Sequence, residues 1–139
     1  MAIERIFDIA GSALSAGSVR LNTVSSNLAN AETVSGTPEG AYRAREPVFA
    51  SVLAGQVGAQ APQSTGVRVL GIVESTAEPR MEYRPDHPEA DPDGYIYHSN
   101  VNVMEQLADL ISASRSYQTN VDVMSTARQL LLKTLELGR

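Results

Sequence analysis

The residues best suited to chemistry lie in one acidic turn, EADPDGYI. Glu89, Asp91, Asp93 and Gly94 occupy positions one, three, five and six of a calcium-binding loop. Asn100 stands at position twelve, where such a loop needs a bidentate glutamate, and prolines before and inside the turn interrupt the loop and its entering helix. We therefore expect a structural turn here, without a bound ion.

Other reactive groups also lack the neighbouring residues that catalysis or metal binding needs. His87 and His98 stand in turn-rich sequence without an HExxH pattern or a clear third ligand, and the chain has no cysteine. Glu74 and Glu78 are paired carboxylates with no neighbouring signature, and no G-x-S-x-G, P-loop or Rossmann glycine pattern occurs. The sequence predicts a protein that is not an enzyme, with no catalytic, cofactor-binding or metal-binding residue and no small-molecule substrate.

Charge and hydropathy exclude further classes of protein. The 139 residues carry a net charge of -5 and lack the clustered lysines and arginines that nucleic-acid binding requires. No stretch approaches the roughly 18 continuous apolar residues of a membrane span. The start MAIERIFDIAGSAL is charged where a secretory signal is apolar. We expect a chain that stays in the cytoplasm or leaves it without a cleaved signal.

The first thirty residues have the period of a long helix. Apolar residues, with one glycine among them, step by four and three without a slip through Ile3, Phe7, Ala10, Leu14, Gly17, Leu21, Val24, Leu28 and Ala31. This spacing is a heptad seam. A shorter stripe beside it, Ile6, Ile9, Ala13 and Ala16, makes the apolar face too wide for one partner helix, so more than one neighbour is expected.

The last forty residues predict a second long helix. Its stripe runs through Val103, Leu107, Leu110, Ser114, Tyr117, Val121, Met124, Arg128, Leu131 and Leu135. Asn102 with Glu105 fits a capping box at its start, and Gly138 stands where a glycine cap would end it. We expect the two helices to pair with each other in antiparallel orientation.

Between the helices the period changes to two. GVRVLGIVES alternates as a strand, and AYRAREPVF, PRMEYRP and GYIYH are shorter candidates, while residues 54–66 read as a mobile loop. The predicted fold is mainly α: an antiparallel coiled coil of long N- and C-terminal helices, with a β-hairpin or irregular β-rich insertion between them. Its parts are residues 1–34, 35–99 and 100–139, the first and last forming one helical domain.

Three asparagines, Asn22, Asn27 and Asn30, crowd the end of the first helix, where the residue type is a poor helix former. One interpretation is that Asn27, beside Leu28 on the seam, bonds a neighbouring helix and fixes its register. The other is that the asparagines only cap and fray the last turn.

The same segment carries a family resemblance. IFDIAGSALSAGSVRLNTVSSNLANAET closely resembles the N-terminal segment of bacterial flagellar axial proteins, whose first helix closes on a motif matched here by Ser25, Asn27, Leu28, Ala29, Asn30 and Thr33. The tail resembles their C-terminal helix, through Asn100, Val101 and Glu105 at its start and Ser114, Arg115, Tyr117 and Asn120 in its middle. YRPDHPEADPDGYIYHSNVN is similar to the proximal-rod members. Ser99 departs from the pattern, since the family usually has proline there, and a looser turn is expected.

The resemblance implies a structural subunit of the proximal rod of the flagellar basal body, in the drive shaft that carries torque from motor to hook and is needed for motility. Implied partners are other copies of the chain, related rod proteins, proteins of the junction between the MS ring and the rod, and the flagellar type III export apparatus. Implied localisation is the rod across the periplasm. The alternative is a coiled-coil adaptor or export chaperone, which would be fully helical and dimeric.

In a filament the seam residues become the predicted assembly interface. The expected residues are Ile3, Phe7, Leu14, Leu21, Val24, Asn27, Leu28, Asn30, Leu107, Leu110, Arg115, Tyr117, Asn120, Val121, Met124, Leu131 and Leu135. Leu21 and Leu131, in mid-stripe, are expected to be buried in the assembly.

Overall fold

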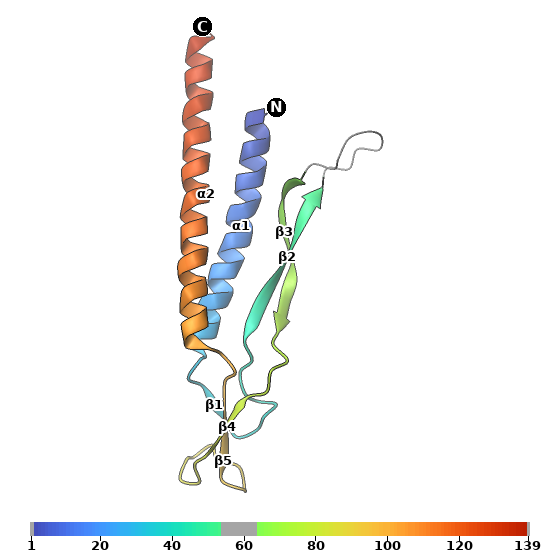
Figure 1. The fold of residues 1–139 in the computed structure, drawn as a ribbon, viewed down its shortest axis with the longest axis vertical. Coiled ribbons are helices and arrows are strands. Elements are labelled where there is room, and N and C mark those ends of the chain that lie inside the picture. Colours follow the sequence, from blue (N-terminus) through green and yellow to red (C-terminus); the bar gives the residue numbers. More distant parts are fainter. Residues whose placement is uncertain (1, 54–63, 139) are drawn as a thin grey trace.

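A computed structural model describes residues 2–53 and 64–138 as an elongated molecule (Figure 1). Two helices, α1 (Ala2–Ala29) and α2 (Val103–Leu137), flank five strands, β1 (Val34–Ser35), β2 (Arg45–Leu53), β3 (Ser64–Glu74), β4 (Arg80–Tyr83) and β5 (Tyr95–His98). The N-terminal end of α1 and the C-terminal end of α2 lie at the same end of the molecule, and the small sheet lies at the opposite end (Figure 1). No helix in the described part is both long and apolar enough to span a membrane.

Helix α1 stands between two neighbours. It packs against α2 on one side and against β2 and β3 on the other. Every position of its predicted stripe is buried or half-buried, with Ala10, Val24 and Ala31 at 3–4 % exposure. A second row, which includes the buried Ala16 and Thr23, lies away from that stripe. The prediction of more than one neighbour is therefore confirmed, and the second neighbour is a β-hairpin.

Helix α2 begins at the predicted N-cap, Asn102, although the described hydrogen bonds include none from the Glu105 side chain that would complete the predicted capping box. The side chain of Asn102 accepts hydrogen bonds from the backbone N–H groups of Met104 (3.1 Å) and Glu105 (3.4 Å), which satisfies donors that the first helical turn leaves open. Gly138 ends the helix at φ −89°, so the left-handed glycine cap expected there is not formed. The C-terminal end of α2 extends past the N-terminal end of α1 (Figure 1).

The face that α2 turns inward differs from the predicted stripe. Apart from Asp109, its least exposed positions step by four and three from Gln106 through Leu110 to Ala113, and again from Asn120 through Met124 to Ala127. Leu110 and Met124 belong to the predicted stripe, whereas Leu107, Val121 and Arg128 are exposed. The other eight of the ten predicted positions are exposed, so the predicted stripe is mostly wrong. Small and amide side chains, which hydropathy undervalues, occupy the inner face instead and let the two helices approach closely.

The β strands form two separate antiparallel units in the described residues. β2 and β3 make a two-stranded hairpin that pairs Arg45 with Glu74 and Val48 with Gly71 and carries register shifts after Val48 and Val52. The strand predicted from GVRVLGIVES is confirmed, and AYRAREPVF contributes the first part of β2. Most of the predicted mobile loop, residues 54–63, lies outside the described residues, and its last residues belong to β3.

The hairpin rests closely on α1. Gly66 is buried, and a Cβ atom added to it would stand 2.5 Å from the Ser12 hydroxyl oxygen. That hydroxyl accepts a hydrogen bond from the Val67 backbone N–H at 3.0 Å and donates to the Ile9 carbonyl oxygen at 2.8 Å. The backbone φ of Gly66 is +154°, which side-chain-bearing residues rarely adopt. Glycine is therefore required where strand and helix meet.

The small sheet has the order β1–β5–β4 and ties the two helix ends together. Ser99, just after β5, is fully buried; its backbone N–H donates to the Thr33 carbonyl oxygen at 3.3 Å, and its hydroxyl accepts from the Val101 N–H at 3.1 Å. Proline has no N–H for the first of these bonds. The expectation of a looser turn at Ser99 is thus wrong.

The acidic turn before β5 is a structural turn, as predicted. One Asp91 carboxylate oxygen accepts bonds from the backbone N–H groups of Asp93 (3.0 Å) and Tyr95 (2.8 Å). Gly94 has φ +86°, the left-handed conformation that glycine adopts without strain. The described residues contain no group of three or more acidic or histidine side chains arranged to hold a metal ion.

Candidate assembly interface

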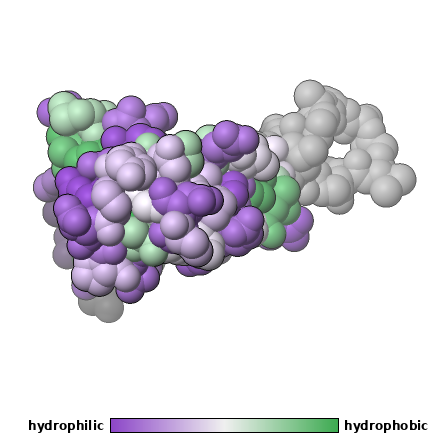
Figure 2. All heavy atoms as spheres, turned by 90° about the horizontal axis from the view of Figure 1, so that it is seen from below, coloured by the Kyte–Doolittle hydropathy of each residue, from purple (hydrophilic) through white to green (hydrophobic). Residues whose placement is uncertain are grey.

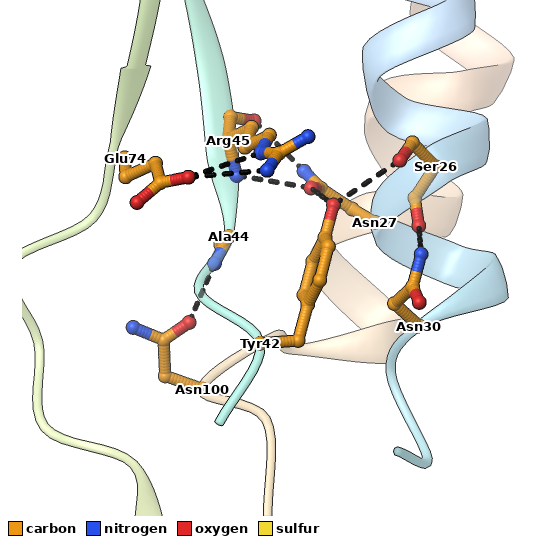
Figure 3. Close-up of polar contacts among 8 residues, drawn as sticks. All are labelled: Ser26, Asn27, Asn30, Tyr42, Ala44, Arg45, Glu74 and Asn100. Carbon is orange, nitrogen blue, oxygen red and sulfur yellow. Dashed lines mark hydrogen bonds and ion pairs between the residues drawn. The ribbon is translucent and has the colours of Figure 1, made fainter. Parts of the chain in front are cut away.

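Asn27 is the centre of the most buried polar cluster in the described structure (Figure 3). It is 1 % exposed. Its amide nitrogen donates to the Arg45 carbonyl oxygen (2.8 Å) and to the Gln106 side-chain oxygen (2.9 Å). Its amide oxygen accepts from the Arg45 backbone N–H (2.9 Å) and the Tyr42 hydroxyl (3.0 Å). One side chain thereby joins α1 to both α2 and β2.

The surroundings of Asn27 hold these partners in place. The Tyr42 hydroxyl also lies 3.2 Å from the Ser26 hydroxyl, and the Arg45 guanidinium lies 5.6 Å from the centre of the Tyr42 ring (Figure 3). The same guanidinium pairs with Glu74 across the hairpin at 3.2 Å. Next to this cluster Ala31, Ala44 and Val101 form a small apolar core. Because every polar atom of Asn27 has a partner, the cluster fixes the relative position of three elements.

The three asparagines of α1 have different roles. Asn27 bonds the neighbouring helix, which confirms the first interpretation, and the helix it reaches is α2 of its own chain. The Asn30 side chain bonds the Ser26 carbonyl oxygen at 2.8 Å, within the last turn, as the capping interpretation predicts. Asn22 is exposed. A second tie between the helices is the ion pair of Arg20 with Asp109 at 3.0 Å.

Gln106 was missed by the sequence analysis. It is 6 % exposed and faces Asn27. Its type suggests a surface position, and the adjacent Leu107 fits the apolar stripe better. The signal that was available is its spacing of seven from Ala113, since Gln106, Ala113, Asn120 and Ala127 form a heptad row of their own.

The predicted interface residues fall into three sets. Val24 and Asn27 are buried; those half-buried are Ile3, Phe7, Leu14, Leu21, Leu28, Asn30, Leu110, Asn120 and Met124; those exposed are Leu107, Arg115, Tyr117, Val121, Leu131 and Leu135. The buried and half-buried residues lie in contacts within the chain or at the edges of those contacts. The exposed set leaves apolar surface on α2. Their role in assembly stays a prediction.

Exposed apolar residues also cover the hairpin and the small sheet. Leu70, Ile72 and Val73 of β3 are 52–60 % exposed, and Met81 and Tyr83 of β4 are 61–64 % exposed. Figure 2, a view from the end that carries β4 and β5, shows a largely hydrophilic surface with hydrophobic residues gathered near its margins. An open cleft of about 330 Å³ lies between α1 and the hairpin, lined by residues that include Val19, Thr23 and Ile72.

Two ionisable groups of the small sheet have shifted pKa values. The hydrogen bond from His98 (2.6 Å), with further help from Arg84 (3.0 Å), holds the pKa of Glu82 below its usual 4.5 despite partial burial. Partial burial, together with the nearby Asp91 carboxylate, raises the pKa of the Tyr97 hydroxyl above 10.0. The bonds of both groups stay within the small sheet and its turns, Glu82 with His98 and Arg84 and Tyr97 with Asp91.

Replacing Glu82 by Gln is expected to remove a pH-dependent part of the stability. Because the pKa of Glu82 is lowered in the folded chain, its contribution is complete above about pH 4.5 and is lost as the pH falls through the lowered pKa. Urea unfolding of wild type and Glu82→Gln should differ at about pH 7 and converge at a pH below the lowered pKa of Glu82. Glu78→Gln, an exposed control, should match wild type at both. An equal difference at both pH values would contradict this role.

Comparison with known proteins decides the family. Residues 7–36 match the family of flagella basal body rod proteins, and residues 93–137 match the C-terminal family of the flagellar basal body rod FlgEFG proteins. The flagellar basal-body rod protein FlgC of Salmonella typhimurium is 47% identical over 140 residues, with 100% of both chains covered. The chain belongs to the FlgC family of flagellar basal-body rod proteins. FlgC of Yersinia enterocolitica is 49% identical over the full length of both chains, and FlgC of Bacillus subtilis is 33% identical over 95% of each.

Membership in the FlgC family makes the chain a structural protein of the flagellar basal body rather than an enzyme, as predicted. The two family matches fall on α1 with the segment after it and on β5 with α2. They therefore cover two of the three elements that meet at Asn27, α1 and α2, but not β2. A fully helical adaptor, the alternative raised by the sequence, differs from the observed chain, whose described residues include five strands.

Proposed function

We propose that the chain is a subunit of the proximal rod, assembling with copies of itself and with related rod proteins into the drive shaft that transmits torque from the motor to the hook. The observation that carries this proposal is the unpartnered apolar surface. A compact monomer of 14.9 kDa would expose about 7,000 Å², whereas this chain exposes 9813 Å². The excess is total surface and goes with the elongated shape of the chain. Apolar side chains stand exposed on it, Leu70, Met104 and Leu137 among them, and such surface favours burial against neighbouring subunits.

The helical part of the subunit is proposed to act as an antiparallel coiled coil. Steps of four and three on the inner face of α2 support it, as does the close approach of the helices at Gly17, where an added Cβ atom would stand 3.4 Å from the Tyr117 ring. Residues 1–34 and 100–139 would then form one helical domain, and residues 35–99 an insertion that adds a second surface.

The proposal also covers where the subunit lies in the cell and how it is exported. The subunit would lie in the rod across the periplasm, next to the proteins that join the rod to the MS ring, and would reach that place through the flagellar type III export apparatus without a cleaved signal. Membership in the FlgC family of flagellar basal-body rod proteins supports the place in the basal body.

A strain that lacks this chain is the direct test. We expect it to be non-motile because a shaft with a missing segment cannot transmit torque. Swimming on soft agar measures the effect, and a plasmid copy of the gene should restore it. Normal swimming by the deletion strain would refute the proposed function.

A further inference from the structure

Two apolar patches lie at opposite ends of α2. The entry patch consists of Val103, Met104, Leu107 and Ile111, and the exit patch of Leu130, Leu131, Leu132, Leu135 and Leu137. Met104 and Leu137 are the most exposed of these, at 75 % and 87 %. Between the patches the exposed residues are mostly serine, threonine, glutamine and charged side chains, with Tyr117, Val121 and Val123 as exceptions.

The fold leaves both patches without cover from the described chain. The exit patch lies on the part of α2 that extends past the end of α1 (Figure 1). The entry patch lies at the start of α2, where Gln106 occupies the side facing α1 and leaves Met104 and Leu107 outside the pair. The hairpin packs on α1, so it covers neither patch.

Distance prevents the two patches from meeting within one chain. Met104 and Leu132 are 28 residues apart on one helix, a separation of about 42 Å. A contact between them must therefore join two subunits, head to tail. A head-to-tail contact generates a ring if its rotation closes and an open filament if it does not, and a rod requires the second.

The charges at the two ends are complementary. Glu105 stands within the entry patch and Asp109 borders it, while the exit patch holds Lys133, the only lysine of the sequence, with Arg128 one turn before it. Asp109 is already paired with Arg20, so Glu105 is the carboxylate available to an incoming cation. Glu136, the acidic residue of the exit patch, is a turn from Lys133. Apolar contact flanked by opposite charges favours one orientation.

We propose that the exit patch of one rod subunit docks on the entry patch of the next, with Lys133 beside Glu105. The entry patch is thus occupied by the C-terminal end of an α2-type helix, which carries leucines and a basic group. The family match at residues 93–137 spans both patches, and a second copy of this chain supplies such a helix end. This inference rests on the proposed function and specifies its contact.

Zero-length carbodiimide cross-linking of purified basal bodies tests the contact. Because the chain has one lysine, peptide mass spectrometry can assign each cross-link of its side chain. We expect Lys133 to be joined to an acidic residue in the first turns of a neighbouring subunit's terminal helix, which is Glu105 where the neighbour is a copy. Lys133→Arg keeps the charge but should lose the cross-link.

Matched variants separate docking from chance proximity. Leu135→Asp should abolish the cross-link, whereas Gln118→Asp, on the polar middle of α2, should leave it at the wild-type level. Cross-links from Lys133 only to the hairpin, or none in intact rods, would overturn the proposal. So would normal cross-linking by Leu135→Asp. None of these cross-linking results bears on the deletion strain, so the proposed contact can be refuted while the rod function stands. Swimming by the deletion strain, in contrast, would refute the rod function itself.

Discussion

We expect the Asn27→Ala variant to lose about 2–4 kcal/mol of its free energy of unfolding, because buried groups that leave a hydrogen bond unmade are costly. The change leaves the Gln106 side chain and both backbone polar groups of Arg45 without their partner and opens a small cavity beside Tyr42. Urea unfolding followed by circular dichroism measures the loss. Against a typical total of about 5–15 kcal/mol, the effect is large.

Asn22 supplies a matched control for this measurement. It is the same residue type on the same helix, but it is exposed. Asn22→Ala should change the free energy of unfolding by no more than about 0.5 kcal/mol, as surface substitutions usually do. Equal losses in the two variants would show that Asn27 does not hold α1, α2 and β2 together.

The Val24→Asp variant is expected to build no rod and to leave cells non-motile. Val24 is 4 % exposed and belongs to the α1 stripe, so the substitution places a carboxylate without a partner inside the chain. We expect a cost of at least about 3 kcal/mol per subunit. Every copy in the assembly carries the same defect. Swimming assays and electron microscopy of basal bodies report the outcome.

Ser25→Asp is the control for the charge itself. Ser25 is the next residue of α1 and is exposed, so its carboxylate stays in water at little cost. This variant should swim. Normal rods in the Val24→Asp strain would contradict the role of the α1 stripe, and loss of rods in both strains would show that charge on α1 is the cause rather than burial.

Sequence periodicity predicts α1 well because its apolar residues and its burial agree. Ile3 through Ala31 form one stripe, and each member is buried or half-buried. The strands between the helices are predictable for a similar reason, since their alternation is bounded by glycine and proline. Asn102 caps α2 as its motif indicates. In each of these segments, interactions between residues close in sequence determine the structure.

The inner face of α2 was not predictable in the same way. Gln106, Ala113 and Ala127 are buried because α1 comes close, whereas the more apolar Leu107 and Val121 are left outside. Packing between elements that are distant in sequence decides which side of α2 is buried, and the sequence of α2 alone does not show it. The docking of the hairpin on Ser12 and the four bonds of Asn27 also depend on long-range contacts, so the motif located Asn27 but not its partners.

Electron microscopy of basal bodies from the strain that lacks this chain tests the central claim most directly. The claim is that the chain is a structural segment of the rod. We predict membrane rings without an assembled rod, and complete basal bodies when the gene is returned. Complete rods in the deletion strain would contradict it.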